Sequence, residues 1–172
     1  MNASPGRSGK LGSALIAAAV VVLDRLTKIA ILHTFTSSDI LPVIPGIFNI
    51  VHAENPGAAF SMLAEASPLV RKLVLIGLST TVLVFVGILL WRTPKASGAA
   101  AIDDALMRWG LALVFGGAFG NLIDRVFRGT VTDFIQVFLG SYDFPAFNVA
   151  DSAITIGAAL LVIDLLRSRK AS

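Results

Sequence analysis

The sequence predicts an all-α membrane protein with four transmembrane helices and a few short strands outside the membrane. Of its 172 residues, 55% are hydrophobic and only 15% are charged, which is too apolar for an ordinary soluble domain of this size. Apolar runs long enough to cross a bilayer recur along the chain, and basic residues gather at one set of their ends. We therefore expect one membrane-embedded domain over residues 1–172.

The composition also limits the chemistry. The chain has no Cys and only two His, so disulfides, thiol nucleophiles and an ordinary zinc site lack the residues that form them. The net charge of +3 is small and follows the expected topology, so nucleic-acid binding has little support. We expect no metal and no cofactor, and membrane lipids rather than nucleic acid as surroundings.

The first transmembrane helix is expected at about residues 11–32. Residues 11–23 carry no charge, and the apolar run resumes after a charged interruption, giving about the 20 residues that cross a bilayer. A secretory signal peptide is the competing interpretation, but no small-x-small cleavage site follows and the charges do not suit one. Asp24 and Lys28 share a helix face. They form either an interfacial ion pair or a structural or substrate-contacting pair beneath an active site.

Residues 33–70 are expected to lie outside the membrane, on the extracytoplasmic side. Turn signals and a β-prone stretch at 47–52 predict two or three short strands there. Asn55 precedes Pro56, Gly57 and several small residues. This pattern is typical either of a tight turn with an Asx-type hydrogen bond or of a backbone that comes close to an extended peptide. We include Asn55 and Gly57 among the candidate residues that bind substrate or support the catalytic pair of carboxylates described below, which we call the dyad.

The second and third transmembrane helices are expected at about residues 72–91 and 102–123. The second has no charge from Leu73 to Trp91. The third contains Gly116-x-x-x-Gly120, a surface that lets another helix approach closely. Three polar residues follow on one side of this helix: Asn121, Asp124 and Arg125. They are either a charged helix cap or a polar cluster that faces the carboxylates described next.

Residues 124–146 form the second expected extracytoplasmic segment, with a strand at 131–138 and a turn at 140–143. The fourth transmembrane helix is expected at about residues 147–166. Asp133 in the strand and Asp151 in the helix both have apolar neighbours in sequence. A lone carboxylate is costly in such surroundings, and one relief is a second carboxylate that shares one proton. Such a pair can also act as general acid and general base on a water molecule.

Asn148 is predicted to orient this pair. It lies three residues before Asp151, within one helical turn, and a neutral amide can hold a carboxylate without fixing it as an anion. Arg125 is better suited to the peptide backbone of a substrate or to a carbonyl linked to a lipid.

The distribution of basic residues predicts the topology. With four helices, eight basic residues fall on the side of both termini and four on the other side. The eight are Arg7, Lys10, Arg92, Lys95, Arg108, Arg167, Arg169 and Lys170, and the four are Arg71, Lys72, Arg125 and Arg128. The larger group marks the cytoplasmic side. We expect both termini in the cytoplasm and the candidate site at the outer face of the membrane.

Five blocks of the chain, in a fixed order over residues 24–152, match the motifs of one known family. The blocks are Asp24-Arg25-Leu26-Thr27-Lys28, Asn55-Pro56-Gly57-Ala58-Ala59-Phe60-Ser61, Gly116-Gly117-Ala118-Phe119-Gly120-Asn121-Leu122-Ile123-Asp124-Arg125, Val131-Thr132-Asp133-Phe134 and Phe147-Asn148-Val149-Ala150-Asp151-Ser152. With them the chain resembles lipoprotein signal peptidase (signal peptidase II), the bacterial aspartic peptidase family of the inner membrane.

The resemblance implies four transmembrane helices, a small extracytoplasmic β-cradle, and a catalytic pair at Asp133 and Asp151. It implies as substrate a prolipoprotein whose lipobox Cys carries diacylglycerol, cut on the amino side of that Cys. Positions that the family uses around the substrate and the catalytic pair match Asn55, Asn121, Arg125 and Asn148. Asp24 and Lys28 match the first block of the family.

Two other classes of protein fit the residues taken alone. A proton-coupled transporter also uses intramembrane Asp residues, but it predicts carboxylates near the midplane and an internal repeat, and the chain shows no repeat. A membrane scaffold or lipid-binding chaperone explains the Gly-x-x-x-Gly pattern but not the two Asp residues. A substrate assay separates these classes from a peptidase.

Overall fold

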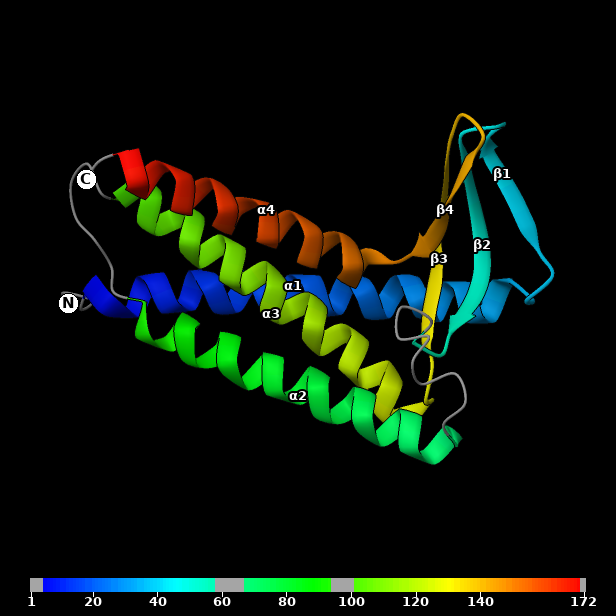
Figure 1. Cartoon of the computed structure of the whole chain (residues 1–172), viewed down its shortest axis with the longest axis horizontal. Helices are drawn as coiled ribbons and strands as arrows, with labels where there is room; N and C mark the ends of the chain where they lie inside the picture. Colours follow the sequence, from blue (N-terminus) through cyan, green and yellow to red (C-terminus); the bar gives the residue numbers. More distant parts are fainter. Residues whose placement is uncertain (1–4, 58–66, 94–100, 171–172) are drawn as a thin grey trace.

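The computed structural model describes residues 5–57, 67–93 and 101–170. Over these residues it shows four helices and one four-stranded antiparallel sheet (Figure 1). In chain order they are α1 (Pro5–Thr34), β1 (Ile40–Ile44), β2 (Phe48–Asn55), α2 (Pro68–Arg92), α3 (Ala101–Phe127), β3 (Val131–Leu139), β4 (Tyr142–Phe147) and α4 (Val149–Lys170). The helices form an elongated bundle with the sheet at one end. The first turn of α1 and the last turn of α4 lie at the other end.

Among the described residues, three helices are long and apolar enough to cross a membrane: α2, the Ala105–Phe127 part of α3, and the Val149–Ser168 part of α4. Helix α1 is 30 residues long but is not among them, because charged residues interrupt its apolar run. The chain is therefore a mostly helical membrane protein with a small sheet.

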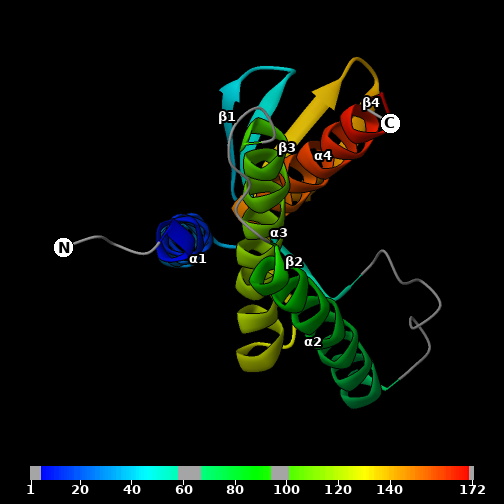
Figure 2. The same cartoon turned by 90° about the vertical axis from the view of Figure 1, so that its left-hand side faces the viewer.

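Helix α3 is the centre of the bundle and packs against each of the other three helices (Figure 2). Its glycines make this possible. A Cβ atom added at Gly116 would lie 2.8 Å from the carbonyl oxygen of Ala17 in α1. A Cβ atom at Gly117 would collide with the carbonyl oxygen of Ala150 in α4. The close approach predicted from the Gly-x-x-x-Gly pattern is thus confirmed.

Helix α1 has the distribution of side chains expected in lipid. The residues that it buries lie along one stripe, and two of them are charged: Ser13, Ala17, Asp24, Lys28 and Ile31. Six large apolar side chains of α1, by contrast, are exposed: Leu11, Leu15, Val22, Leu23, Leu26 and Ile29. Polar groups face the protein and apolar groups face outward, which suits a hydrocarbon solvent.

The sheet has the strand order β1-β2-β3-β4, and each neighbouring pair is antiparallel. The predicted strand at 131–138 is confirmed as β3, and the β-prone stretch at 47–52 lies largely in β2. The predicted turn at 140–143 is wrong at its second half, because β4 begins at Tyr142. Phe147, expected as the first residue of the last helix, is the last residue of β4.

Candidate functional site

The two predicted catalytic carboxylates lie where the sheet meets the bundle. Asp133 is on β3, opposite Ala53 of β2, and Asp151 is in the first turn of α4. Asn148, which precedes α4 and is fully buried, contacts both. Its Nδ2 donates to Asp133 Oδ1 at 2.7 Å, and its Oδ1 accepts from the Asp151 backbone N–H at 2.9 Å. The structure therefore brings the predicted pair together around one amide.

The same Asn148 explains why the helix begins where it does. Its side chain caps the N-terminus of α4 by accepting from Asp151, and Asp151 Oδ2 accepts in return from the Asn148 backbone N–H at 3.2 Å. This reciprocal pair is a capping box, with Asn and Asp in the places often taken by Ser and Glu. The sequence analysis placed Asn148 inside the fourth helix, whereas Asn148 is the N-cap residue that precedes its first residue, Val149.

Asp133 receives two amide donors. Asn55 Nδ2 donates to its Oδ2 at 3.0 Å, and Asn148 donates to its Oδ1. The pKa of the Asp133 carboxyl is raised to about 6, chiefly by burial. The charge of Asp151 also raises this pKa, whereas the hydrogen bonds from Asn55 and Asn148 and the charge of Lys28 lower it. The Asp133 carboxyl thus keeps its proton to a higher pH than an ordinary Asp.

Asn55 confirms the first interpretation of its motif, the Asx turn, and it also contacts the predicted pair of carboxylates. Its Oδ1 accepts from the Gly57 backbone N–H at 2.9 Å, as in an Asx turn, while its Nδ2 holds Asp133. Gly57 has φ 92°, a conformation that favours glycine, and an added Cβ would lie 2.5 Å from Leu75 Cδ1. The rest of this motif, Ala58 to Ser61, lies outside the described residues. Residues 94–100, between the second and third helices, lie outside them as well.

Asp151 is held by Asn121 of α3, whose Nδ2 donates to Asp151 Oδ1 at 2.7 Å. Asn121 Oδ1 accepts from Lys28 Nζ at 2.9 Å and from Asn148 Nδ2 at 3.2 Å. Ammonium is a donor only, so its contact fixes which end of the Asn121 amide faces Asp151.

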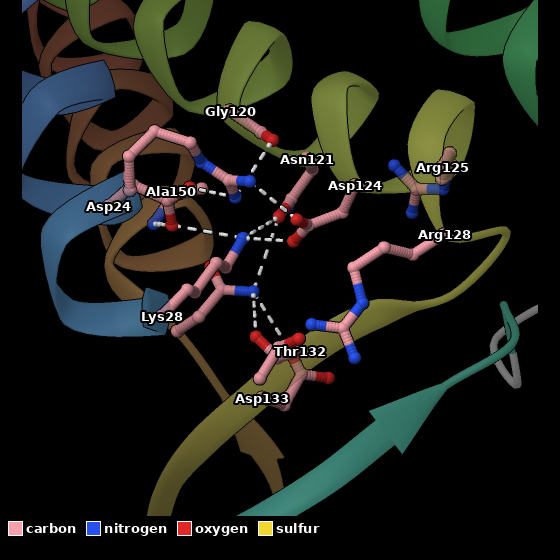
Figure 3. A network of polar contacts seen from close by, with 12 residues as sticks. Asp24, Lys28, Gly120, Asn121, Asp124, Arg125, Arg128, Thr132, Asp133 and Ala150 are labelled. Carbon is pink, nitrogen blue, oxygen red and sulfur yellow. Dashed lines mark hydrogen bonds and ion pairs between the residues drawn. The ribbon is translucent and has the colours of Figure 1, made fainter. Parts of the chain in front are cut away.

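A second cluster lies directly beside the dyad and is made of charges (Figure 3). We call Asp24, Arg25, Lys28 and Asp124 the charge cluster. Lys28 Nζ lies 3.0 Å from Asp24 Oδ1 and 2.8 Å from Asp124 Oδ2, and Arg25 pairs with the same two carboxylates at 2.8 and 2.6 Å. The predicted pairing of Asp24 with Lys28 is confirmed.

The charge cluster also fixes the start of α4. Asp24 Oδ1 accepts from the Ala150 backbone N–H at 3.2 Å, next to Asp151 in the chain. Gly120 leaves room for this carboxylate, since an added Cβ would lie 2.8 Å from Asp24 Oδ2. An acidic group beside a helix N-terminus is stabilising. Helix α1 thereby sets the position of the dyad although it contributes neither member.

The polar residues at the end of α3 divide between the two clusters. Asn121 faces the dyad as expected, whereas Asp124 belongs to the charge cluster. Sequence reasoning grouped Asp124 with Asn121 in a possible cluster facing Asp133 and Asp151, and it left Arg25 out of the candidate site. The sequence did contain a signal for an ion pair between Arg25 and Asp124, since a charged residue inside an apolar run needs a partner of opposite charge.

Arg125 stands apart from the network and lines a cavity instead. Its Nη1 lies 3.5 Å from Ser79 Oγ of α2, and Figure 3 draws no dashed line from Arg125 to Asp133. The cavity has about 240 Å³ and lies between α2, α3 and α4. Its walls are largely apolar, and its polar lining groups include Asn121, Arg125 and Asp151. A guest in this cavity would reach the Asp151 carboxylate.

Among the residues that the structure describes, no group of three or more His, Asp or Glu side chains is placed to hold a metal ion. The chemistry that the arrangement supports is proton transfer. Asp133 and Asp151 have no Lys or Arg within ion-pair distance in the described part of the chain.

Comparison with known proteins agrees with this site. A family model described as signal peptidase (SPase) II matches residues 16–167. The chain is 40% identical over 155 residues to the lipoprotein signal peptidase of Solibacter usitatus (strain Ellin6076), covering 90% of each protein. It is 47% identical over 147 residues to the lipoprotein signal peptidase of Ralstonia nicotianae (strain ATCC BAA-1114 / GMI1000), covering 86% of this chain and 79% of that protein.

Solved structures agree as well. One titled "Bacterial membrane enzyme structure by the in meso method at 2.3 A resolution" has a TM-score of 0.75 and 35% identity, covering 94% of this chain and 91% of that one. A second, with the same title at 1.9 Å resolution, has a TM-score of 0.73 and 36% identity, covering 90% of this chain and 92% of that one.

The apolar helices and the family match define the class of this protein as a membrane-embedded peptidase of the aspartic type. The chain belongs to the signal peptidase II family. The family removes signal peptides from prolipoproteins, and this chain is a peptidase for that reaction. The transporter and scaffold alternatives are thereby set aside.

Proposed function

We propose that Asp133 and Asp151 are the catalytic pair and that the enzyme cuts on the amino side of a diacylglyceryl-modified Cys. The observation that carries this proposal is the set of donors around the two carboxylates. Asn55, Asn121 and Asn148 are all neutral amides. Such donors hold a carboxylate in place without the strong preference for the anion that a bound cation gives. One proton can then be shared by the pair.

We assign the shared proton to Asp133, whose buried carboxyl has a pKa raised to about 6, and the role of general base to Asp151. Asp151 takes a proton from water as the water oxygen bonds to the scissile carbonyl carbon, and Asp133 gives its proton to the carbonyl oxygen. As the tetrahedral intermediate collapses, Asp151 gives the proton that it took to the departing Cys nitrogen, the C–N bond breaks, and Asp133 recovers a proton from the hydroxyl of the new carboxyl group. Atoms and charge balance with water as the only co-reactant.

Lys28 is a positioning residue in this mechanism. It is 1% exposed and contacts Asn121 rather than either catalytic carboxylate. Its ammonium holds the Asn121 carbonyl oxygen and so directs the amide N–H toward Asp151. Direct contact between an ammonium and Asp151 would favour the anion too strongly for proton exchange.

The cavity between α2, α3 and α4 supports a place for the substrate. Its apolar walls suit a signal peptide or an acyl chain, and Asp151 lies in its lining. Arg125 lies in the same lining and can donate to a peptide carbonyl or to an ester carbonyl of the lipid. We place Arg125 on the substrate and not in the proton transfer.

The proposed topology has four membrane-spanning helices, both termini in the cytoplasm and the dyad at the outer face. The charge cluster supports the span of α1, because the charges that interrupt its apolar run are paired with one another and with Asp124. The eight-to-four distribution of basic residues supports the direction. Reporter fusions after Ser172 and within residues 93–101 should report cytoplasm, and a fusion near Ser37 the outer side. A cytoplasmic signal near Ser37 contradicts this topology.

The reaction is tested with purified protein and two substrates, a diacylglyceryl-modified prolipoprotein and the same chain without lipid. We expect cleavage of the lipidated form only, with the lipidated Cys as the new N-terminus by mass spectrometry. Equal cleavage of both forms would contradict the lipid requirement, and a different cut site would contradict the position of cleavage.

A further inference from the structure

A second and larger cavity lies on the other side of α3, between α1, α2 and α3. It has about 550 Å³ and shares no lining residue with the cavity at Asp151. Small side chains of α1 and Gly87 of α2 form part of its lining, and Phe115 and Phe119 of α3 stand beside them. These two rings are parallel within 3°, with centroids 6.4 Å apart. We call this cavity the α1–α2 recess.

The recess is open because the helices bring small residues to it. Ala14, Ala17 and Ala18 line it from α1. Gly87 has no side chain to fill it, and an added Cβ would lie 3.2 Å from the Phe115 ring. No step of the peptidase reaction uses these residues.

The length of the recess matches one leaflet of a bilayer. Its lining on α1 runs from Lys10 to Val22, a span of twelve residues or about 18 Å of helix. Half the hydrocarbon core of a bilayer is about 15 Å thick. An extended acyl chain of one leaflet therefore fits along the recess from end to end.

One end of the recess carries a cation and an aromatic ring. Lys10 Nζ lies 3.9 Å from the centroid of the Trp91 ring, at the end of the bundle that lies away from the sheet. Trp and Lys are typical of the depth of lipid headgroups. Lys10 is the one charged residue in the described lining, and an ammonium over a ring still has N–H donors for a phosphate.

We propose that the α1–α2 recess binds one anionic phospholipid, with its phosphate at Lys10 and an acyl chain along the small residues of α1. The lipid comes from the leaflet at the end of the bundle opposite the sheet. A signal peptide is the competing occupant. Signal peptides carry a basic segment before their apolar segment, which would place like charges beside Lys10. The charge of the recess therefore favours the lipid.

The test uses tryptophan fluorescence, because the chain has only two Trp residues. Trp109→Phe leaves Trp91 at the recess, and Trp91→Phe leaves Trp109, which does not line it, as the reference. Each protein is reconstituted in phosphatidylcholine vesicles with a small, equal fraction of acyl-brominated phosphatidylglycerol or phosphatidylcholine. We expect Trp91 to be quenched about fivefold more effectively by the anionic lipid, the preference that one basic residue gives. Trp109 should show little difference.

Three variants in the Trp109→Phe background make the assignment specific. Lys10→Gln should abolish the preference, Lys10→Arg should keep it, and Ala18→Phe should reduce quenching by both lipids because its ring fills the recess. The matched control is Arg92→Gln, which removes an exposed basic residue next to Trp91 that does not line the recess. It should leave the preference intact.

Equal quenching of Trp91 by the two lipids would overturn the proposal, as would a preference that survives Lys10→Gln or that Arg92→Gln removes. Adding an unlabelled prolipoprotein signal peptide separates the occupants. Loss of quenching at Trp91 but not at Trp109 would assign the recess to the signal peptide instead. Failure of these tests leaves the peptidase reaction and its dyad untouched, because the two cavities are separate.

Discussion

The protein holds two pairs of buried carboxylates side by side and treats them differently. In the charge cluster, Asp24 and Asp124 are 0% and 2% exposed, and both contact the cations Arg25 and Lys28. In the dyad, Asp133 and Asp151 contact the amides of Asn55, Asn121 and Asn148. In both environments each carboxylate lies against nitrogen groups of neighbouring side chains.

The difference decides what each pair can do. Ion pairs with two cations offset the cost of burying Asp24 and Asp124, so the charge cluster is suited to holding helices together. Contact with an amide leaves the proton free to move between partners. Lys28 connects the two pairs. Its ammonium contacts both carboxylates of the charge cluster, and it also orients the Asn121 amide that contacts the dyad. A cation can thus support the dyad from one residue away.

The largest effect is expected when the dyad itself is changed. Asp133→Asn and Asp151→Asn keep size and shape, so each should insert and fold while losing roughly 10⁴-fold in cleavage rate. Neither variant can form the state in which one acid and one base share a water. The double variant should be scarcely worse than either single, since the two residues act as a unit. Cleavage rates at equal amounts of membrane-inserted protein provide the measurement.

Asp143→Asn is the matched control for this comparison. Asp143 is an exposed carboxylate on β4 that accepts from Gln136 at 3.1 and 3.2 Å. It has amide contact like the dyad but no burial, so its variant should keep its activity. Substantial turnover by either dyad variant, or loss in Asp143→Asn alone, would mean that other carboxylates carry the reaction.

Lys28→Met tests the connection between the two pairs. It leaves Asp24 and Asp124 short of one cation, which should cost about 3–5 kcal/mol of stability. The misplaced Asn121 should lower the rate by about 10²-fold. Since Lys28 lowers the pKa of the Asp133 carboxyl, its removal should raise that pKa. The alkaline limb of the pH–rate profile should then move to higher pH.

Adding Asp124→Asn to Lys28→Met separates structure from positioning. It removes the charge left without its lysine, so some stability should return. The altered pH profile should remain, because the Lys28 charge that lowers the pKa of the Asp133 carboxyl is still missing. Full recovery of both rate and profile would show that Lys28 acts only by keeping the bundle folded.

A smaller effect is expected at Arg125, a cation that belongs to neither pair. Arg125→Ala should lower kcat/KM about 10- to 100-fold, mainly through KM, because it removes a charged donor to substrate. Arg125→Lys should recover only part, since a point charge lacks the planar fork. Steady-state kinetics with the lipidated substrate measure both. A fall in kcat at unchanged KM would place Arg125 in the proton transfer.

The smallest effect concerns stability and pH. The pKa of the Asp133 carboxyl rises from 3.8 to about 6 on folding, so the folded state binds more protons between these values. Stability therefore falls as pH rises from about 4 to above 6. Asp133→Asn removes this dependence, so the difference in stability between the two proteins should change with pH across this range. Thermal unfolding midpoints of both proteins across this pH range test it, and parallel curves would contradict the raised pKa.

Much of this architecture follows from local patterns. Apolar runs predicted where the helices lie, and the i, i+4 spacing of Asp24 and Lys28 predicted their ion pair. Asp133 and Asp151 were predicted together because a carboxylate with apolar neighbours needs a partner, and Asn148 connects them. These inferences succeed because they depend on residues close in sequence or on the cost of burial.

Other features depend on which neighbour a helix face meets, and spacing does not contain that information. Asn121 and Asp124 share one side of α3, yet the first contacts Asp151 and the second contacts Arg25. Strand β4 escaped prediction because Tyr142–Phe147 contains Pro145, which argues against a strand. As the edge strand of the sheet it pairs only with β3 and can accommodate Pro145.

The charge cluster has a consequence for biosynthesis. Asp24, Arg25 and Lys28 leave the ribosome early, but Asp124 lies 99 residues after Arg25. At about 5–20 residues per second, the first helix waits roughly 5–20 s for that carboxylate. Until then it carries a net positive charge from these residues and has no α3 to bury it, so in the proposed four-span topology we expect it to be the least securely inserted helix of the nascent protein. Arrival of α3 supplies both the missing anion and the glycine surface, which ties the anchoring of the first helix to completion of the active site.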